Sequence, residues 1–206
     1  YYMGVFPVTG SQYARIMGTS TTSTDMVPMR NVTWNSLRNS AGVNAAVAGN
    51  KDNTANFFVR FNGLTGLSFD LPTEEMGEIA ERAGATTLYY WGDTHIADYT
   101  SATASSYLKV GTTLPNKWGF YDFETVCYLM RDVGQYVDKA TENLADIYTA
   151  NATDSSGNSA GYRRRGGCDK GHTSRNYSDY SASRRAVVAA STGTAYTGFR
   201  VAFVVK

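Results

Sequence analysis

The chain has 206 residues, of which 42% are hydrophobic and only 18% are charged, and its formal net charge is +1. This length and apolar content suit a single domain over residues 1–206, and the near-neutral charge argues against attraction of nucleic acid or membranes by the overall field. No apolar run approaches the roughly 18 residues that span a bilayer, so no membrane insertion is expected. The start at Tyr1, without a methionine or a signal-like segment, indicates a trimmed chain or part of a longer protein.

The first predicted elements are a strand and a short helix. Residues 1–8 are expected to be extended. Thr9 and Gln12 have the spacing of a capping box in front of apolar residues at helical positions, and Gly18 is the expected stop. The polar residues 19–26 predict a loop.

A second short helix is expected after another extended stretch. Residues 27–34 favour extended chain, and Asn35 is the expected cap of a helix that runs through Leu37 toward Val47. Residues 49–56 predict a turn.

The clearest helical pattern begins after Thr73, which suits an N-cap, and ends at Gly84. Apolar residues recur at helical spacing, namely Met76, Ile79, Ala80 and Ala83. The acidic residues of this helix are interpreted as a solvated face rather than as paired catalytic carboxylates, namely Glu74, Glu75, Glu78 and Glu81.

The rest of the chain predicts long connections and short strands. From Thr86 onward Gly, Ser, Thr and Tyr are frequent, and residues 151–161 suit an exposed loop. Apolar residues alternate over 199–205, which predicts a closing strand. The sum is an α+β fold with two main helices, short strands and long loops.

Residues 168–197 have the composition of a binding surface. They lie between Arg165-Gly166-Gly167 and Gly198-Phe199-Arg200 and are rich in Tyr, Ser, Asn and Asp, as in binding loops. The predicted contact residues are Asp169, Lys170, His172, Arg175, Asn176, Tyr177, Asp179 and Tyr180, with Ser191, Thr192, Thr194 and Tyr196 at the far edge. The alternative is a solvated loop without a partner, but three tyrosines among so few charges favour a contact surface.

Several short motifs along the chain follow a recognisable order. They are Val32-Thr-Trp34-Asn35, Leu71-Pro-Thr-Glu74-Glu75 with Glu78-Ile-Ala-Glu-Arg82-Ala-Gly84, Tyr90-Trp91-Gly92, Val110-Gly111, Pro115-Asn-Lys-Trp118-Gly-Phe-Tyr121-Asp122, Arg165-Gly-Gly167 and Gly198-Phe-Arg200-Val-Ala202. This series resembles the formylglycine-generating-enzyme (sulfatase-modifying factor) family, a branch of the C-type lectin fold. The resemblance spans nearly the whole chain and implies that fold.

The resemblance also shows where this chain departs from the family's chemistry. The cysteine pair that the generating enzymes use with copper falls here on Gly171 and Asn176, so a soft thiolate site for copper is missing. The asparagine of the family's calcium loop is replaced by Val126, and Asp122 alone would not supply six to eight oxygen ligands. We therefore expect a non-catalytic protein without a metal or cofactor.

The remaining histidines and cysteines leave alternatives open. His95 and His172 are too few for the three-histidine iron site of related enzymes. Cys127 and Cys168 are either two buried thiols, which we favour, or one disulfide in an oxidising compartment. Cys168 with His172 could suggest a catalytic dyad, but chance is the better explanation in a region of this composition.

What remains is binding, and the chain resembles the variable proteins of diversity-generating retroelements. In such proteins the diversified segment lies between the same two motifs, and in this chain it would be residues 168–197. The resemblance implies a protein ligand on a cell or host surface, and display of the chain on a cell surface or a virion. A protein ligand is also favoured because no apolar cluster for a pocket accompanies the polar residues. The alternatives are a divergent oxidoreductase of the same family and a structural surface domain without a ligand.

Arginines and tryptophans complete the prediction. Residues 161–185 hold seven basic and two acidic residues, a local excess of five positive charges that could indicate nucleic acid. The family resemblance instead implies that Arg165 and Arg185 link loops through hydrogen bonds. Nothing else supports a nucleic-acid partner. The same resemblance implies that Trp34, Trp91 and Trp118 are core residues or loop anchors, and Trp91 could lie near the binding face.

Overall fold

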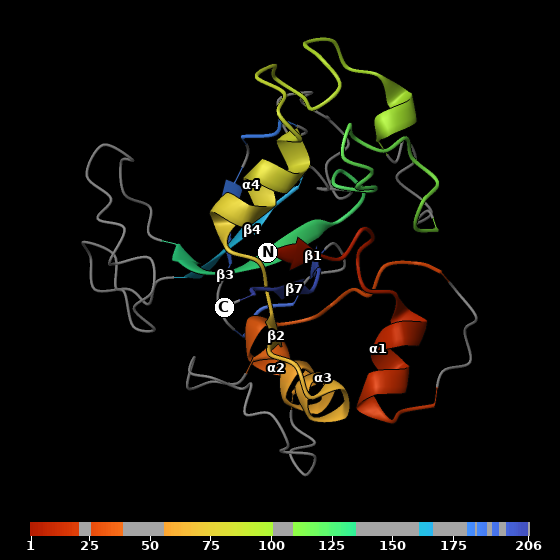
Figure 1. Cartoon of the computed structure of the whole chain (residues 1–206), viewed down its shortest axis with the longest axis vertical. Coiled ribbons are helices and arrows are strands. Elements are labelled where there is room, and N and C mark those ends of the chain that lie inside the picture. The colour runs from red at the N-terminus through yellow and green to blue at the C-terminus, as the bar shows by residue number, and fades with distance from the viewer. Residues whose placement is uncertain are drawn as a thin grey trace.

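The computed structural model describes residues 1–20, 26–38, 56–100, 109–134, 161–166, 181–183, 185–188, 191–193 and 197–205. Within these ranges four α-helices and two small sheets form the expected α+β fold, where the sequence predicted two main helices. Helices α1, α2 and α3 lie together at one end, and α4 packs against strands β3 and β4 (Figure 1). None of the helices in the described ranges is both long and apolar enough to cross a membrane.

Helix α1, Gly10–Met17, begins and ends where the sequence predicts. The hydroxyl of Thr9 accepts a hydrogen bond from the backbone of Gln12 at 3.2 Å, and the Gln12 side chain accepts one from the backbone of Thr9 at 2.9 Å. Gly18 ends the helix with φ 67°. The predicted capping box is confirmed, so local sequence sets both ends of this helix.

Helix α2, Trp34–Leu37, is capped by a different residue from the one predicted. The hydroxyl of Thr33, rather than the side chain of Asn35, accepts from the backbone of Ser36 at 2.9 Å. Ser36 accepts a hydrogen bond from the Thr33 backbone in return, so the cap is reciprocal. The expected continuation toward Val47 lies outside the described residues.

Helix α3, Phe57–Thr65, lies where no helix was predicted. Asn56 is its cap, accepting from the backbone of Val59 at 3.2 Å, so it begins a helix instead of ending the predicted turn. The helix opens with Phe57, Phe58 and Val59, all buried. Three successive apolar residues, followed by the buried polar Asn62, hide the 3.6-residue period by which an amphipathic helix is recognised.

Helix α4, Glu74–Arg82, follows the predicted cap Thr73, and Ala80 of its predicted apolar face is buried, but other positions differ from the prediction. Glu74 is 6% and Glu81 1% exposed, whereas Ile79 is 50% exposed. The interpretation of the glutamates as a solvated face is therefore wrong at Glu74 and Glu81, whereas Glu75 is exposed and Glu78 is partly exposed. The helix packs on β3 and β4, where a buried arginine attracts the carboxylates.

Two sheets join the ends of the chain to its middle. The first has the order β1, Tyr2–Met3, then β7, Ala202–Phe203, then β2, Phe69–Asp70, with both pairs antiparallel. The second has the order β5, Arg185–Val188, then β4, Gly161–Arg165, then β3, Cys127–Gly134, then β6, Thr197–Gly198. In it only the β3–β6 pair is parallel. Tyr2 is paired with Phe203, so both ends of the chain meet at the first sheet (Figure 1).

The predicted terminal strands are shorter than expected. Within residues 1–8 only β1 is a strand, and within residues 199–205 only β7. The alternation predicted for the last strand fails because Phe199 and Arg200 are both buried. Arg200 is buried among the loop carbonyls to which it donates hydrogen bonds, and not on the face of a sheet.

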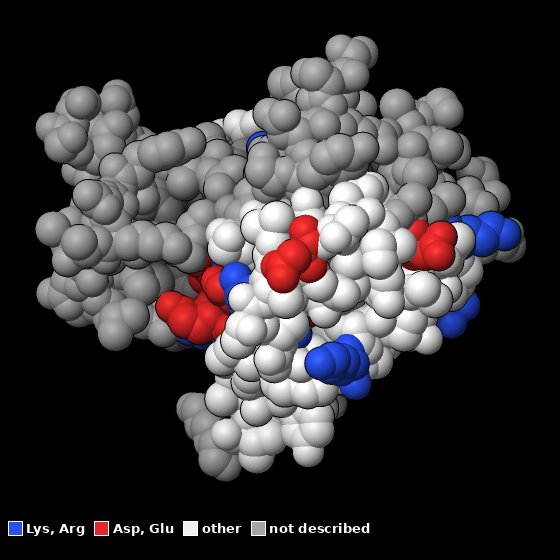
Figure 2. Space-filling model, turned by 90° about the horizontal axis from the view of Figure 1, so that it is seen from above, with Lys and Arg blue, Asp and Glu red and all other residues white. Residues whose placement is uncertain are grey.

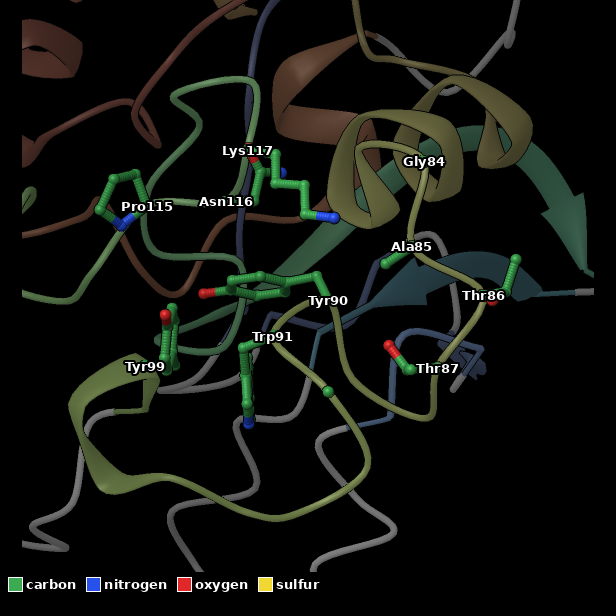
Figure 3. Close-up of a pocket in the computed structure, with 11 residues that line it drawn as sticks. Gly84, Ala85, Thr86, Thr87, Tyr90, Trp91, Tyr99, Pro115, Asn116 and Lys117 are labelled. Atoms are coloured by element: carbon green, nitrogen blue, oxygen red, sulfur yellow. The ribbon is translucent and has the colours of Figure 1, made fainter.

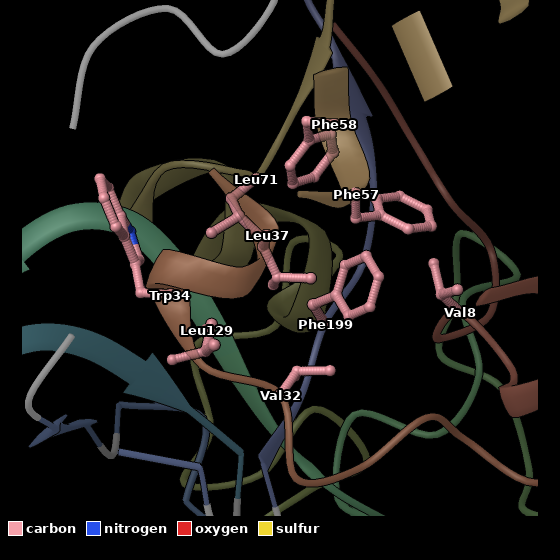
Figure 4. Packing of buried hydrophobic residues seen from close by; sticks show 9 residues of the cluster. All are labelled: Val8, Val32, Trp34, Leu37, Phe57, Phe58, Leu71, Leu129 and Phe199. Carbon is pink, nitrogen blue, oxygen red and sulfur yellow. The ribbon is translucent and has the colours of Figure 1, made fainter. Parts of the chain in front are cut away.

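The main core is centred on Phe199, the residue that follows β6. Its ring contacts the Phe57 ring edge-to-face, with centroids 4.9 Å apart and planes at 77°. Figure 4 shows the buried side chains of this cluster, which are Val8, Val32, Trp34, Leu37, Phe57, Phe58, Leu71, Leu129 and Phe199. The end of the chain is thereby packed against α2 and α3.

The tryptophans have unequal roles. Trp34 is 1% exposed and belongs to the core, as predicted. Trp118 is 56% exposed, so its assignment as a core residue or anchor is wrong. At this turn the anchor is Asn116, whose side chain holds the Trp118 backbone at 3.0 Å and leaves the indole at the surface.

Candidate functional site

Arg165, at the end of β4, connects helix α4 to the backbone of Ala182. Its guanidinium donates to Glu74 at 3.3 Å and to Glu78 at 3.1 Å, and lies 3.7 Å from Glu81. The same guanidinium donates to the backbone carbonyl of Ala182. The side chain is 1% exposed, so this is a buried ionic cluster, and the role predicted for Arg165 is confirmed. The side chain of Arg185 lies outside what the structure describes.

A fourth carboxyl group, that of Glu124, belongs to the cluster. Glu124 is 1% exposed and shares a hydrogen bond with Glu81. Burial raises the pKa of Glu81 to about 7, against the opposing effects of Arg165 and of the Glu124 hydrogen bond. Burial, followed by the charges of Glu124 and Glu81, also raises the pKa of Tyr90, which therefore stays neutral.

Gly166 is required by the turn that leaves β4. Its φ is 94°, in the region that favours glycine. A Cβ there would lie 2.7 Å from the carbonyl oxygen of Val126 and 2.8 Å from that of Phe123. In the Arg-Gly-Gly motif, the buried charge of Arg165 is thus followed by a backbone at Gly166 that passes close to the residues just before β3.

Arg200 fixes the other side of the predicted binding region. Its guanidinium donates to the carbonyls of Gly4 at 3.0 Å and Val5 at 2.7 Å, and to the carbonyl of Tyr121. It also stacks on Phe123 and Tyr128, with 4.2 and 4.7 Å from its carbon to the two ring centroids. A planar five-donor group can bind several loop carbonyls at once, which explains this buried arginine.

Most of the predicted contact residues lie outside the described ranges. These are Asp169, Lys170, His172, Arg175, Asn176, Tyr177, Asp179, Tyr180, Thr194 and Tyr196. Ser191 and Thr192 are described, and both are exposed, as contact residues must be. The structure thus describes the residues on both sides of the region and, within it, residues 181–183, 185–188, 191–193 and 197.

Asp122 has a structural role. Its carboxylate accepts from the backbone of Gly111 at 2.6 Å and from the hydroxyl of Thr113 at 2.8 Å, and the residue is 1% exposed. Both oxygens therefore serve the loop around Thr113. No group of three metal-binding side chains is found in the part of the chain that the structure describes.

A pocket of about 370 Å³ lies beyond the C-terminal end of α4. Residues 84–87, 90–92, 115–117 and Tyr99 line it, as Figure 3 shows. The Trp91 ring stacks on Tyr99 with centroids 4.9 Å apart, and Tyr90 meets Trp91 edge-on at 4.6 Å. This aromatic pocket corrects the expectation that no pocket-forming cluster accompanies the binding region.

The pocket adjoins the binding region through the backbone. The amide of Ala182 donates to the carbonyl of Leu88 at 3.0 Å, and Leu88 lies between Thr87 and Tyr90 in the pocket-lining segment. The segment that contains Trp91 is thus bonded to the backbone of Ala182, and a position of Trp91 near the binding face stays a prediction. The sequence did not identify three of the pocket-lining residues, namely Tyr99, Asn116 and Lys117. The pocket is formed by three separate segments, and no local sequence pattern connects them.

Surface charge is mixed on the face seen in Figure 2. Acidic and basic side chains alternate there among uncharged residues, in the part that the structure describes. Arg165 and Arg200 contribute nothing to the surface because both are 1% exposed. Two of the chain's arginines are thus used inside the molecule.

Comparisons with known proteins agree with this fold. The sequence profile of the sulfatase-modifying factor enzyme 1-like domain family matches residues 1–205. The comparison with curated proteins gave no match.

Several solved structures share the fold at low sequence identity. Treponema denticola variable protein 1 has a TM-score of 0.66 and 18% identity, over 97% of this chain and 82% of that one. PvdO from Pseudomonas aeruginosa has a TM-score of 0.66 and 18% identity, over 97% and 78%. CarF has a TM-score of 0.63 and 14% identity, over 97% and 84%. The fold predicted from the ordered motifs is confirmed.

Proposed function

The chain belongs to the sulfatase-modifying factor enzyme 1-like domain family, and we propose that it uses this fold to bind a partner rather than to catalyse a reaction. The proposed contact surface is the binding region, residues 168–197. We propose that a diversity-generating retroelement varies the sequence of this region. The similarity to a variable protein from Treponema denticola is consistent with this use of the fold.

One observation carries the proposal: the scaffold holds the middle of the region, at Ala182, and the chain just beyond its end through backbone groups. Arg165 donates to the carbonyl of Ala182, and the amide of Ala182 donates to the carbonyl of Leu88. Beyond the region, Arg200 binds the carbonyls of Gly4 and Val5. Side chains within the region can therefore change while these attachments persist, which a diversified surface requires.

Absence of the family's oxidase chemistry is the second part of the proposal. Gly171 and Asn176 occupy the positions that match the cysteine pair of the generating enzymes, and neither residue offers a thiolate. We expect the purified protein to contain neither copper nor iron in stoichiometric amounts and to leave a cysteine-containing peptide unoxidised. Copper at one equivalent, with oxygen consumption in the presence of such a peptide, would contradict a binding-only function.

The partner that we propose is a protein on a cell or host surface, and the chain itself would be displayed on a cell surface or virion. Tyr177, Tyr180 and Arg175 are the proposed central contacts, since aromatic and arginine side chains supply most of the binding energy in protein interfaces. Ser191 and Thr192, both exposed, extend the contact surface.

Sequencing the 3′ end of the gene across a population tests the proposal. The structure sharpens the expected result, because two positions inside the region should not vary. Ala182 is fully buried, and a Cβ at Gly193 would lie 2.6 Å from the carbonyl oxygen of Asn31. We expect substitutions at adenine-templated codons, including those of Ser191 and Thr192, with Ala182 and Gly193 constant.

Residues 85–115 serve as the internal control, a scaffold stretch of similar length. Substitutions spread evenly over both stretches would refute retroelement diversification. An unvarying binding region would refute it equally. Substitutions as frequent at Gly193 as at Ser191 would show that close backbone packing does not restrict which positions of the region can vary.

A further inference from the structure

The aromatic pocket has the features of a fixed binding site, because its described lining comes from the scaffold. Its lining residues, among those that the structure describes, lie between positions 84 and 117, outside residues 168–197. Its volume of about 370 Å³ is at the lower end of the range of ligand pockets, which suits one ring-sized group. Tyr90, Trp91 and Tyr99 supply aromatic walls, which favour an aromatic guest through edge-to-face contacts.

Most polar groups of the pocket are already engaged within the protein. The Asn116 amide donates to the carbonyls of Ala80 at 2.6 Å and Glu81 at 3.0 Å, and its oxygen accepts from two backbone amides of the turn that follows. The Thr87 hydroxyl donates to the carbonyl of Tyr89 at 2.6 Å. The indole nitrogen of Trp91 donates to the carbonyl of Thr94 at 2.9 Å. These groups shape the pocket and are not available to a ligand.

Lys117 is different, because it is the one charged residue among the described residues that line this pocket. It is exposed, and within the described ranges no acidic group or carbonyl accepts from its ammonium. In Figure 3 its side chain extends along the pocket above the Tyr90 ring. A pocket with aromatic walls and a single cation among its described lining residues is complementary to an aromatic group with a carboxylate beside it.

Exposed apolar side chains come from the same segments that line the pocket. They are Leu88, Ile96, Leu114 and Trp118, with 45%, 42%, 47% and 56% of their surfaces exposed. A small molecule inside the pocket would leave such residues in water, whereas a protein surface would cover them. The pocket therefore suits an anchor side chain of a protein partner better than a free metabolite.

We propose that the pocket is a constant anchor site, which receives an aromatic side chain of the protein partner and pairs Lys117 with an adjacent carboxylate of that partner. This inference rests on the proposed binding function and adds a partner chemistry to it. The constant anchor lies beside the binding region, joined to it by the Ala182–Leu88 hydrogen bond. The partner would then be recognised by one invariant contact and many variable ones.

N-acetyltryptophan is the probe for this site, because it joins an aromatic ring to a carboxylate, and N-acetyltryptophanamide is its uncharged control. Binding is followed through the indole N–H resonance of Trp91 in an NMR titration of the whole chain. We expect saturation at millimolar concentrations and a preference of about threefold for the acid, as for one partly solvated ion pair. No saturable shift, or equal affinity for acid and amide, would overturn the proposal.

Variants assign the effect to the pocket. Lys117→Gln should make the acid and amide bind equally, whereas Lys109→Gln, which removes another exposed lysine outside the pocket lining, should keep the preference. Tyr99→Leu should weaken both probes about tenfold, and its unfolding temperature shows whether the fold is retained. A preference that survives in Lys117→Gln would refute the assignment.

Failure of the anchor can be told apart from failure of the proposed function. Because the probe contacts only scaffold residues, replacing Tyr177 and Tyr180 by Ala should leave its affinity unchanged. Population sequencing tests the binding region without reference to the pocket. A missing probe signal with a diversified region would refute the anchor alone, whereas an unvarying region with a normal probe signal would refute the diversification alone.

Discussion

Replacing Arg165 by methionine would remove the cation of the buried cluster while nearly conserving side-chain volume. Glu81 would then lose its opposing charge at 3.7 Å, and the Ala182 carbonyl would lose its donor. Breaking a buried ion pair from one side costs about 3–5 kcal/mol, because the remaining charge stays desolvated. Against a total stability of about 5–15 kcal/mol for a domain, we expect a marked loss in urea-induced unfolding.

The pH dependence of that loss separates charge from packing. Arg165 lowers the pKa of Glu81, so its removal should raise this pKa further above its value of about 7. A raised carboxyl pKa means that the native state is stabilised by protonation and loses stability as the pH increases toward that pKa. Arg165→Met should therefore be less destabilising at pH 5 than at pH 8.

Arg15→Met is the matched control, because Arg15 is exposed on α1 and its replacement should change the free energy of unfolding by less than about 0.5 kcal/mol. A second check is the Glu81→Gln/Arg165→Met double variant, which should be less destabilised than the sum of the single changes. A loss below about 1 kcal/mol for Arg165→Met, or an equal loss at both pH values, would refute the account of the cluster.

Three further changes test other parts of the scaffold by urea unfolding. Asn116→Ala removes four hydrogen bonds of a buried amide and should cost about 2–4 kcal/mol; a cost near zero would contradict its anchoring role. Gly166→Ala should destabilise more than Gly84→Ala, since both glycines have positive φ but only Gly166 has carbonyl oxygens within 3 Å. Glu81→Gln should abolish a fall in stability of up to about 3 kcal/mol between pH 4.5 and 7, and an unchanged slope would exclude Glu81 as its source.

Local sequence predicted those features that local interactions determine. Thr9 with Gln12, and Thr73, cap their helices as expected, because a cap needs only residues a few positions apart. Helix α3 was missed because Phe57 and Phe58 begin a run of three apolar residues, which hides the helical period. The ordered motifs identified the fold correctly, since their order reflects the whole chain and not one element.

Burial of charge could not be predicted in this way. Glu81 resembles an ordinary solvent-facing helix residue until its partner Arg165 is placed against it by the sheet. The same limit applies to the pocket, since Tyr99 and Lys117 come from separate connections that meet only in the folded chain. Ser191 and Thr192 are exposed, as contact residues must be, and their role as contacts stays a prediction.

A diversified surface needs a scaffold whose stability does not depend on the residues that change, and the positions of the two buried arginines meet this requirement. Arg165 and Arg200 bind backbone carbonyls, which every amino acid supplies, so a substitution in the binding region removes no acceptor. Their acidic and aromatic partners lie outside the region, on α4 and near β3. A constant aromatic anchor with Lys117 beside such a surface would provide part of the affinity in every variant. Variation could then alter specificity without each new sequence having to create a binding site from nothing.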